Sequence, residues 1–241
     1  MALWPMDKEL TLVEHLEELR RRIIVSLVLV IIFSVFAFPF APRALAILKA
    51  PSSGMIPRLV FFSPPEAFLI HIKIAFFIGL MLSMPVILYQ LWAFIAPAIA
   101  YNTRRRGFLF LFSSVGAFIC GASFGFFILL PTALKFLLGF SRDTLEPMIS
   151  VSSYISFVLG LVLGCGLVFE MPVLSYLLSK IGLINHRFLR RVWKYAVIII
   201  FIIAAVVTPT PDVFNMTALA IPMLFLYEVS IWVSRFSGKK R

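Results

Sequence analysis

Acidic residues, histidine and cysteine are scarce in this sequence. Of its 241 residues, 11 are Asp or Glu, three are His and two are Cys. No His-Glu-x-x-His pair and no Gly-rich phosphate loop occurs in it. Cys120 and Cys165 both lie in apolar runs, so we expect two small buried side chains rather than a disulfide or a metal pair. The sequence therefore predicts neither an enzyme nor a bound cofactor or metal.

Apolar residues are abundant instead. They make up 61% of the chain, and the mean hydropathy is +1.03, whereas soluble domains are about 45–50% apolar. A bilayer crossing takes about 20 apolar residues, which leaves room for six helices and short connections. We predict an all-α polytopic membrane protein that forms a single membrane domain, residues 1–241. In it, residues 1–22 would form a cytoplasmic amphipathic helix, and transmembrane helices would cover residues 23–40, 67–95, 108–130, 154–178, 192–207 and 213–233.

Proline and length distinguish some of these crossings from the others. Pro85 and Pro222 predict kinks in the second and sixth helices. The fifth apolar run is only about 16 residues long, near the lower limit for a crossing, and we expect the fifth and sixth helices to be short. Between the first two crossings, residues 41–65 are rich in proline, which predicts a turn-rich loop with one short helix at residues 44–49.

The basic residues indicate the orientation. One side of the membrane collects Lys8, Arg20–Arg22, Arg104–Arg106, Lys180, Arg187, Arg190, Arg191, Lys194, Arg235 and Lys239–Arg241, and the other has only Arg43, Lys49, Arg58, Lys135 and Arg142. By the positive-inside rule, both termini are cytoplasmic. The net charge of +11 then reflects orientation and attraction to anionic lipids rather than nucleic-acid binding.

A cluster of carboxylates stands on this basic side, in the segment "VEHLEELRRR" at residues 13–22. Glu14 and Glu18 lie four residues apart on one helix face, with Glu17 beside them, and Glu18 can reach Arg22 on the next turn. Acidic residues near a helix start also favour the positive end of its dipole, so one interpretation is purely structural. The other is that these carboxylates bind a cationic ligand, because this side offers few other acids.

A few polar groups lie at membrane depth. Glu170 is about 16 residues into the fourth crossing, where an ionisable group predicts a functional role unless it is neutral and bonded to a neighbouring helix. We expect it to be protonated or hydrated, with Gln90 and the Thr208 region as candidate partners. Gln90 and Glu228 carry the same two interpretations. The pairs Gly121/Gly125 and Gly160/Gly164 have the small-xxx-small spacing of helix-packing sites.

Four segments together carry a resemblance to a known family. They are "HLEELRRRII" at 15–24, "FFSPPEAFLIHIKIAFFIGLMLSMPVILYQLWAFIAPAI" at 61–99, "SYISFVLGLVLGCGLVFEMPVL" at 153–174 and "TPTPDVFNMTALAIPMLFLYEVSIWVSRF" at 208–236. In order and spacing the chain resembles the TatC family, the receptor and core subunit of the twin-arginine protein translocase. The resemblance covers essentially the whole chain.

The resemblance implies a fold and an activity. The protein would be a cupped arrangement of six helices in the prokaryotic cytoplasmic (inner) membrane, and a homo-oligomer within a larger complex. It would bind signal peptides bearing paired arginines. With single-span TatA/TatB-like partners it would export folded proteins, driven by the proton-motive force.

The resemblance also assigns residues. The signal-peptide-binding carboxylate falls on Glu18, with Arg20 and Arg22 as its basic neighbours and Phe94 as the loop-anchoring aromatic. Thr103 stands where the family usually has a second carboxylate. Either Glu14 or Glu17 substitutes for that carboxylate, or this chain binds twin arginines more weakly, or the position has been altered. It also assigns Asp212, after the fifth helix. Independently, the short fifth and sixth helices favour docking of a partner helix, for which we expect Thr208, Asn215 and Met216 together with Asp212.

Two other functions fit the residues alone. A proton-coupled small-solute carrier would use Glu170 as its proton site. A non-catalytic membrane scaffold would need neither Glu170 nor Glu18. Preference for a twin-arginine peptide over its twin-lysine version separates both from the receptor.

Overall fold

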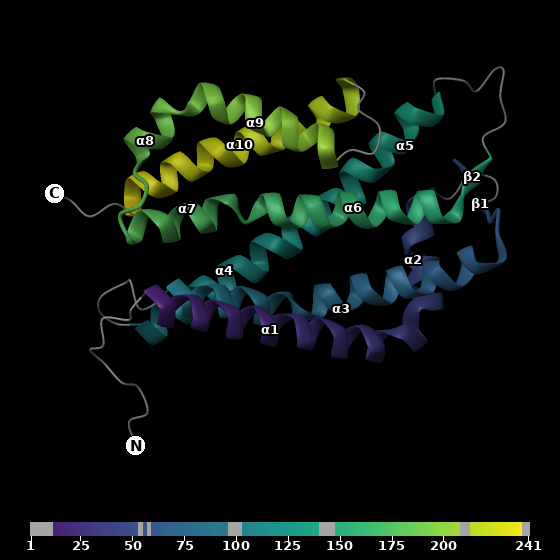
Figure 1. The fold of residues 1–241 in the computed structure, drawn as a ribbon. Helices are drawn as coiled ribbons and strands as arrows, with labels where there is room; N and C mark the ends of the chain where they lie inside the picture. Colours follow the sequence, from purple (N-terminus) through teal and green to yellow (C-terminus); the bar gives the residue numbers. More distant parts are fainter. Residues whose placement is uncertain are drawn as a thin grey trace.

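The computed structural model describes residues 12–52, 55–56, 59–95, 103–139, 148–207 and 213–237, and they are almost wholly helical (Figure 1). The helices are α1 (Leu12–Ala37), α2 (Ala41–Lys49), α3 (Pro64–Ile95), α4 (Thr103–Phe124), α5 (Leu130–Gly139), α6 (Val151–Phe169), α7 (Met171–Lys180), α8 (His186–Arg191), α9 (Trp193–Val207) and α10 (Val213–Ser237). The predicted all-α class is confirmed. One feature that the sequence did not predict is a small parallel sheet, in which β1 (Leu59–Val60) pairs with β2 (Ile149–Ser150).

Among the described residues, five helical segments are long and apolar enough to cross a membrane: Val13–Ser52, Pro64–Ile95, Gly107–Gly139, Val151–Lys180 and Met216–Phe236. A sixth apolar helix, α9, has 15 residues and is therefore about 22 Å long at 1.5 Å per residue, against a hydrocarbon core of ~30 Å. The chain is a multi-pass membrane protein.

Several helices differ from the predicted spans. α1 runs unbroken from Leu12 to Ala37, so the acidic cluster and the first apolar run share one helix. α4, a π-helical turn at Gly125–Leu129 and α5 follow one another without a gap, well past the predicted end at residue 130. The short helix expected at 44–49 within the loop at 41–65 is present as α2 and begins three residues earlier, at Ala41. As predicted, Pro85 lies inside α3 and Pro222 inside α10. The expectation of a short sixth helix is wrong, because α10 has 25 residues.

A single residue separates α6 from α7. Glu170 ends α6, and Pro172 lies in the first turn of α7. Proline has no backbone N–H, so it cannot donate to the carbonyl four residues earlier and interrupts the helical ladder there. The interruption places the Glu170 carboxylate at the junction of two helices.

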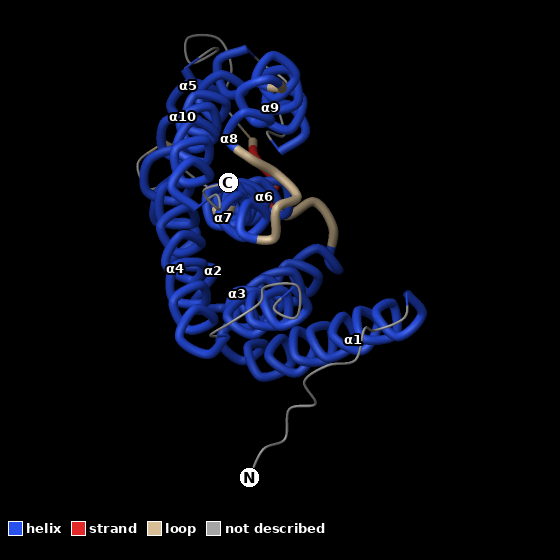
Figure 2. The backbone as a smooth tube through the Cα atoms, turned by 90° about the vertical axis from the view of Figure 1, so that its left-hand side faces the viewer, coloured by secondary structure: helices blue, strands red, loops and turns tan. Residues whose placement is uncertain are grey.

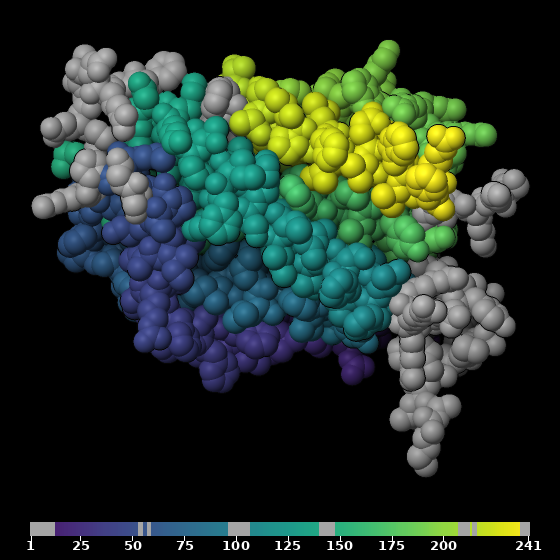
Figure 3. Space-filling view, turned by 180° about the vertical axis from the view of Figure 1, so that it is seen from behind, coloured from purple at the N-terminus to yellow at the C-terminus, as the bar shows by residue number. Residues whose placement is uncertain are grey.

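The α6–α7 segment lies in the middle of the molecule. In Figure 1, α1 and α3 run side by side below it, and α9 and α10 lie above it. Figure 2 views these helices nearly end-on and shows them following one another in a bent row. The α4–α5 segment crosses their back diagonally, with α3 deeper between it and α1 (Figure 3).

The main core forms around α6. Its side chains Ile155, Val158 and Leu161 are almost fully buried and belong to the same apolar cluster as Leu219 and Met223 of α10. Two tyrosines in this core donate hydrogen bonds to carbonyl oxygens, Tyr154 Oη to Leu48 at 2.9 Å and Tyr227 Oη to Leu189 at 2.8 Å. They fasten α2 and α8 to the central helices.

Glycines allow α4 to approach α6 closely. A Cβ atom on Gly121 would lie 2.5 Å from the Cys165 carbonyl oxygen, and one on Gly125 would lie 3.0 Å from the Cys165 Cβ. The packing role expected for these two glycines is confirmed. It is wrong for Gly160, where a Cβ would meet no atom within 4 Å. Burial is confirmed for Cys165 but wrong for Cys120, which lies on the exposed surface of α4.

We predict that Gly121→Ala lowers the stability of the folded protein, because the added methyl group collides with the backbone of α6 and forces the helices apart. Overpacking of this kind costs about 1–3 kcal/mol. Thermal unfolding in detergent, followed by the helical circular-dichroism signal, measures the effect. Gly160→Ala is the matched control and should unfold at the wild-type temperature or slightly above it; equal behaviour of the two variants would contradict the close approach.

Candidate functional site

Helix ends rich in basic residues gather at one end of the molecule, which we call the basic end. It holds the start of α1, the end of α3, the start of α4, the end of α7, α8 and the end of α10, whereas α2, α5 and the β1–β2 sheet lie at the opposite end (Figure 1). Among the described residues, Arg20–Arg22, Lys180, Arg187, Arg190, Arg191 and Arg235 belong to these helix ends. The connections that the sequence groups as basic therefore do lie together in space.

An arginine holds the start of α1 against the end of α3. The Arg22 Nε donates to Glu18 Oε1 at 3.0 Å, and its Nη2 also contacts that oxygen. Across the helix pair, Nη1 donates to Gln90 Oε1 at 3.0 Å and Nη2 to the Ala93 carbonyl at 3.1 Å. Three acceptors from two helices therefore surround one guanidinium group, which fits its fork of planar N–H donors.

The second oxygen of Glu18 is differently placed. Among the described contacts, every hydrogen bond to Glu18 goes to Oε1, while Oε2 lies 4.0 Å from His15 Nδ1. The His15 ring in turn stacks on Phe94, with centroids 4.3 Å apart and an angle of 17° between the planes. The Glu18 side chain is 26% exposed, so part of it can be reached from outside.

The residues Glu18, Arg22, Gln90 and Phe94 thus form one cluster, which we call the α1–α3 cluster and which also includes His15. The sequence predicted the contact between Glu18 and Arg22, and it is confirmed. It did not predict that Gln90 would accept from Arg22 or that His15 would stack on Phe94. Helical spacing can relate residues within α1, but it gives no information on where α3 lies beside it.

The other candidates on α1 do not join this cluster through a described bond to Glu18. Glu14, Glu17 and Arg20 have exposed side chains on the same helix. Met216 is half-buried and packs against the main core. The remaining candidates lie outside the described residues: the side chains of Thr103 and Asn215, and Thr208 and Asp212 entirely.

A separate polar contact lies in the interior. Glu170 is 3% exposed and accepts a hydrogen bond from Ser114 of α4, with the Ser114 Oγ 2.7 Å from Oε2. Within the described structure, Glu170 Oε1 has no hydrogen-bond partner. The partner is therefore Ser114, and the suggestion of Gln90 was wrong, because Gln90 bonds to Arg22 instead. The sequence did offer a sign of this partner, because Ser114 is a polar residue within the apolar run 108–130.

Two further carboxylates bind other parts of the chain. Glu228 of α10 pairs with Arg190 of α8, with 3.2 Å between Oε1 and Nη1. Glu66, at the start of α3, accepts from the Phe62 N–H at 2.7 Å and from the Ser150 hydroxyl and the Ser152 N–H beside β2. Glu66 therefore joins the two short strands at the end opposite the basic end.

The described residues contain no group of three His, Cys, Asp or Glu side chains that could hold a metal ion. The letters Gly-x-Ser-x-Gly occur at residues 121–125, which could suggest a serine nucleophile. These residues lie inside the continuous α4 and π-helical segment, whereas a nucleophile elbow needs a sharp turn from a strand into a helix. The match carries no catalytic meaning here.

Comparison with known proteins gives a consistent result. Residues 14–222 match the family model described as "Sec-independent protein translocase protein (TatC)". The chain is 41% identical over 234 residues to the Sec-independent protein translocase protein TatC of Carboxydothermus hydrogenoformans, covering 97% of this chain and 96% of the relative. The corresponding protein of Aquifex aeolicus is 44% identical over 235 residues, covering 95% and 97%.

A solved structure is also similar. A crystal structure described as "Twin Arginine Translocase Receptor- TatC" superimposes with a TM-score of 0.85 at 43% identity, covering 93% of this chain and 99% of that one. A second structure of that receptor, in DDM, gives the same TM-score at 44% identity.

We predict that Ser114→Ala destabilises the protein, because it leaves the buried Glu170 carboxyl group without its described partner. Such a loss costs about 1–3 kcal/mol. Ser113→Ala is the control, since Ser113 is exposed on the same helix and should behave like wild type in thermal unfolding. In a Ser114→Ala, Glu170→Leu double variant the polar group is gone as well, so part of the stability should return; a double variant less stable than Ser114→Ala would contradict this account.

Proposed function

The chain belongs to the TatC family of Sec-independent protein translocase proteins, and on this premise we propose that it is the receptor and core subunit of a twin-arginine translocase. In this role it binds twin-arginine signal peptides and, with single-span TatA/TatB-like partners and further copies of itself, exports folded proteins using the proton-motive force. It is a transport component rather than an enzyme. The basic end faces the cytoplasm, with both termini on that side of a prokaryotic cytoplasmic membrane, as the positive-inside rule requires.

The observation that supports this proposal most directly is the contact between Glu18 and Arg22. The chain's own guanidinium uses only Oε1 of Glu18, among the described contacts, and the rest of its donors go to Gln90 and Ala93. This arrangement fixes the Glu18 side chain in one position beside the α3 end. A second guanidinium, arriving from the cytoplasm, would meet a carboxylate that is already oriented and whose side chain is partly exposed.

Arginine suits such a site better than lysine does. A guanidinium offers a planar fork of donors and is weakly hydrated, so it can bond a carboxylate and a neighbouring acceptor together, whereas an ammonium group acts as a compact, strongly hydrated point charge. The cluster also offers the stacked pair of His15 and Phe94, an aromatic surface on which a guanidinium plane can lie. These features favour a paired-arginine ligand.

The second arginine of the peptide needs its own acceptor. We propose that Glu14 or Glu17 supplies it, since both are exposed on the helix that carries Glu18. Glu14 lies one turn before Glu18 on the same face, and this spacing suits two successive arginines better than that of Glu17. Thr103 stands at the start of α4, and a threonine hydroxyl carries no negative charge with which to replace a carboxylate.

We predict that Glu18→Gln weakens binding of a twin-arginine signal peptide at least tenfold. The substitution keeps the volume but removes the charge, and hydrogen bonds to charged groups contribute about 1.5–3 kcal/mol each. Fluorescence anisotropy of a labelled peptide with the full chain in detergent measures the change.

The matched control for this measurement is the peptide itself. A twin-lysine version should bind wild type weakly and should lose little further affinity in the variant, so that the two peptides become alike. Thermal unfolding shows whether the variant has kept its fold despite the loss of the Arg22 contact. Undiminished preference for twin arginine in a folded Glu18→Gln protein would contradict the proposed role of Glu18.

We further propose that single-span partner helices pack against α9 and α10. α9 is too short to cross an unperturbed bilayer, and a short helix thins the bilayer or associates with others. Its outward side chains Ile198, Ile202 and Val206 are 58%, 57% and 80% exposed, which leaves an apolar face for another helix.

Cysteine cross-linking tests this docking surface. After replacement of Cys120 and Cys165 by Ala, we expect Val206→Cys or Ile202→Cys to form a disulfide with a cysteine-scanned TatA/TatB-like helix. Phe112→Cys on α4 is the control, because Phe112 is also strongly exposed, at 73%. Preferential cross-linking to position 112 would contradict docking at α9.

A further inference from the structure

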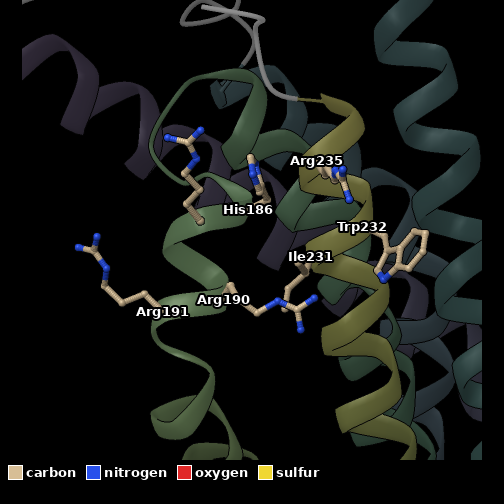
Figure 4. Close-up of a pocket in the computed structure, with 7 residues that line it drawn as sticks. His186, Arg190, Arg191, Ile231, Trp232 and Arg235 are labelled. Carbon is tan, nitrogen blue, oxygen red and sulfur yellow. The ribbon is translucent and has the colours of Figure 1, made fainter.

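A pocket of about 550 Å³ lies at the basic end, between α8 and the last turns of α10. Arg187, Arg190 and Arg191 of α8 line it together with Ile231, Trp232 and Arg235 of α10. Figure 4 shows that Arg190 extends from α8 toward α10, that Arg235 lies above it on α10, and that Arg191 extends outward. His186, at the start of α8, completes the wall.

Local structure fixes this pocket in place. Gly182 has a φ of +83°, a conformation that glycine adopts without strain, and it allows the chain to turn from α7 toward α8. The Asn185 side chain then caps α8 by accepting from the Phe188 N–H at 2.7 Å. The Tyr227 hydroxyl bonds to the Leu189 carbonyl at 2.8 Å and ties α8 to α10.

The charges in the pocket are not balanced. Arg190 pairs with Glu228 at 3.2 and 3.4 Å, and both contacts use Nη1 alone. Across the described part of the chain, no carboxylate lies within ion-pair distance of Arg187, Arg191 or Arg235. Four arginines line the pocket and the described ion pairs give them one carboxylate, so the pocket has an excess of positive charge and favours an anion.

The pocket also lies where a membrane surface would be. The apolar span Met216–Phe236 ends beside it, and Trp232 and Phe236 are 59% and 81% exposed. Tryptophan is enriched at headgroup depth, where its ring faces both acyl chains and water. An anion in this pocket would thus have hydrocarbon on one side.

We propose that this pocket binds the phosphate headgroup of an anionic phospholipid, with Arg190 and Arg235 as its inner donors, Arg187 in its wall and Arg191 reaching outward at its rim. Guanidinium forks match phosphate oxygens in pairs, and basic pockets beside membrane helices on the cytoplasmic side suit such headgroups. Glu228 orients Arg190 through one nitrogen and leaves its remaining donors for the ligand. The exposed ring of Trp232 provides a surface for the adjoining glycerol and acyl chain.

The lipid site is separate from the α1–α3 cluster. Its residues belong to α8 and α10, and none of them contacts Glu18 or Arg22 in the described structure. Lipid binding can therefore be measured without reference to signal peptides, and its failure would leave the proposed receptor function standing.

The test is native mass spectrometry of the full chain in detergent, titrated with dioleoyl phosphatidylglycerol. An Arg191→Gln, Arg235→Gln double variant should bind this lipid about 25-fold more weakly than wild type, since each basic residue near an anionic headgroup contributes roughly fivefold in affinity. The matched control is Arg43→Gln, Lys49→Gln on α2, which removes two exposed positive charges at the other end and should bind as wild type does.

Two further probes identify the ligand. Dioleoyl phosphatidylcholine has the same chains but no net charge and should bind wild type much more weakly than phosphatidylglycerol. Glycerol phosphate has the anion without the chains and should not displace the lipid at equal concentration. Equal binding of the two lipids, equal loss in the α2 variant, or efficient displacement by glycerol phosphate would each overturn the proposal.

Discussion

A polar atom inside this bundle must find its partner within the chain, because neither lipid nor a packed apolar core can supply one. Helices meet this requirement for the backbone, and many interior side chains follow the same rule. Serines within the spans bond to carbonyls one turn back, as Ser34, Ser83 and Ser230 do, or to one another, as Ser179 and Ser234 do across α7 and α10 at 2.7 Å. The hydroxyl groups of Tyr154 and Tyr227 donate to backbone carbonyls of other helices, and these two bonds hold α2 and α8 in place. A few interior hydrogen bonds thus hold neighbouring helices in fixed positions relative to one another.

Glu170 is the described side chain that meets this rule incompletely. Its Oε2 has Ser114, while Oε1 is buried with no partner among the described residues. The contact exists because Gly121 and Gly125 allow α4 to approach α6 and because Pro172 interrupts the helix just after the carboxylate. An unpaired buried oxygen costs free energy, and a group kept at such a cost within a membrane span is a candidate for a functional role.

Sequence patterns predicted what depends on local spacing and on bulk composition. The apolar runs predicted the helical class. The distribution of Lys and Arg predicted which helix ends lie together, and the four-residue spacing of Glu18 and Arg22 predicted their contact. Contacts between distant segments had no such signal: Gln90 and Ala93 join Arg22 across about 70 residues of sequence separation, and Ser114 reaches Glu170 across 56. The parallel pairing of β1 with β2 is too short to leave a pattern of alternation. For Gly160 the sequence pattern was misleading: the small-xxx-small spacing is present, but no atom of a neighbouring helix lies within 4 Å of a Cβ at that position.

The basic end poses an electrostatic problem for a receptor of cationic peptides. Arg20–Arg22 adjoin Glu18, and four more arginines surround the α8–α10 pocket, so a peptide with two arginines approaches an end of its own sign. Close pairing offsets part of this repulsion: Arg22 is bound to Glu18, and Arg190 to Glu228. Anionic headgroups in the α8–α10 pocket would neutralise several of the remaining charges and lower the potential that a peptide meets, and they would leave the Glu18 carboxylate at the start of α1 unchanged. A charged lipid surface attracts arginine and lysine alike, whereas an oriented carboxylate can distinguish the planar guanidinium fork from a compact ammonium group.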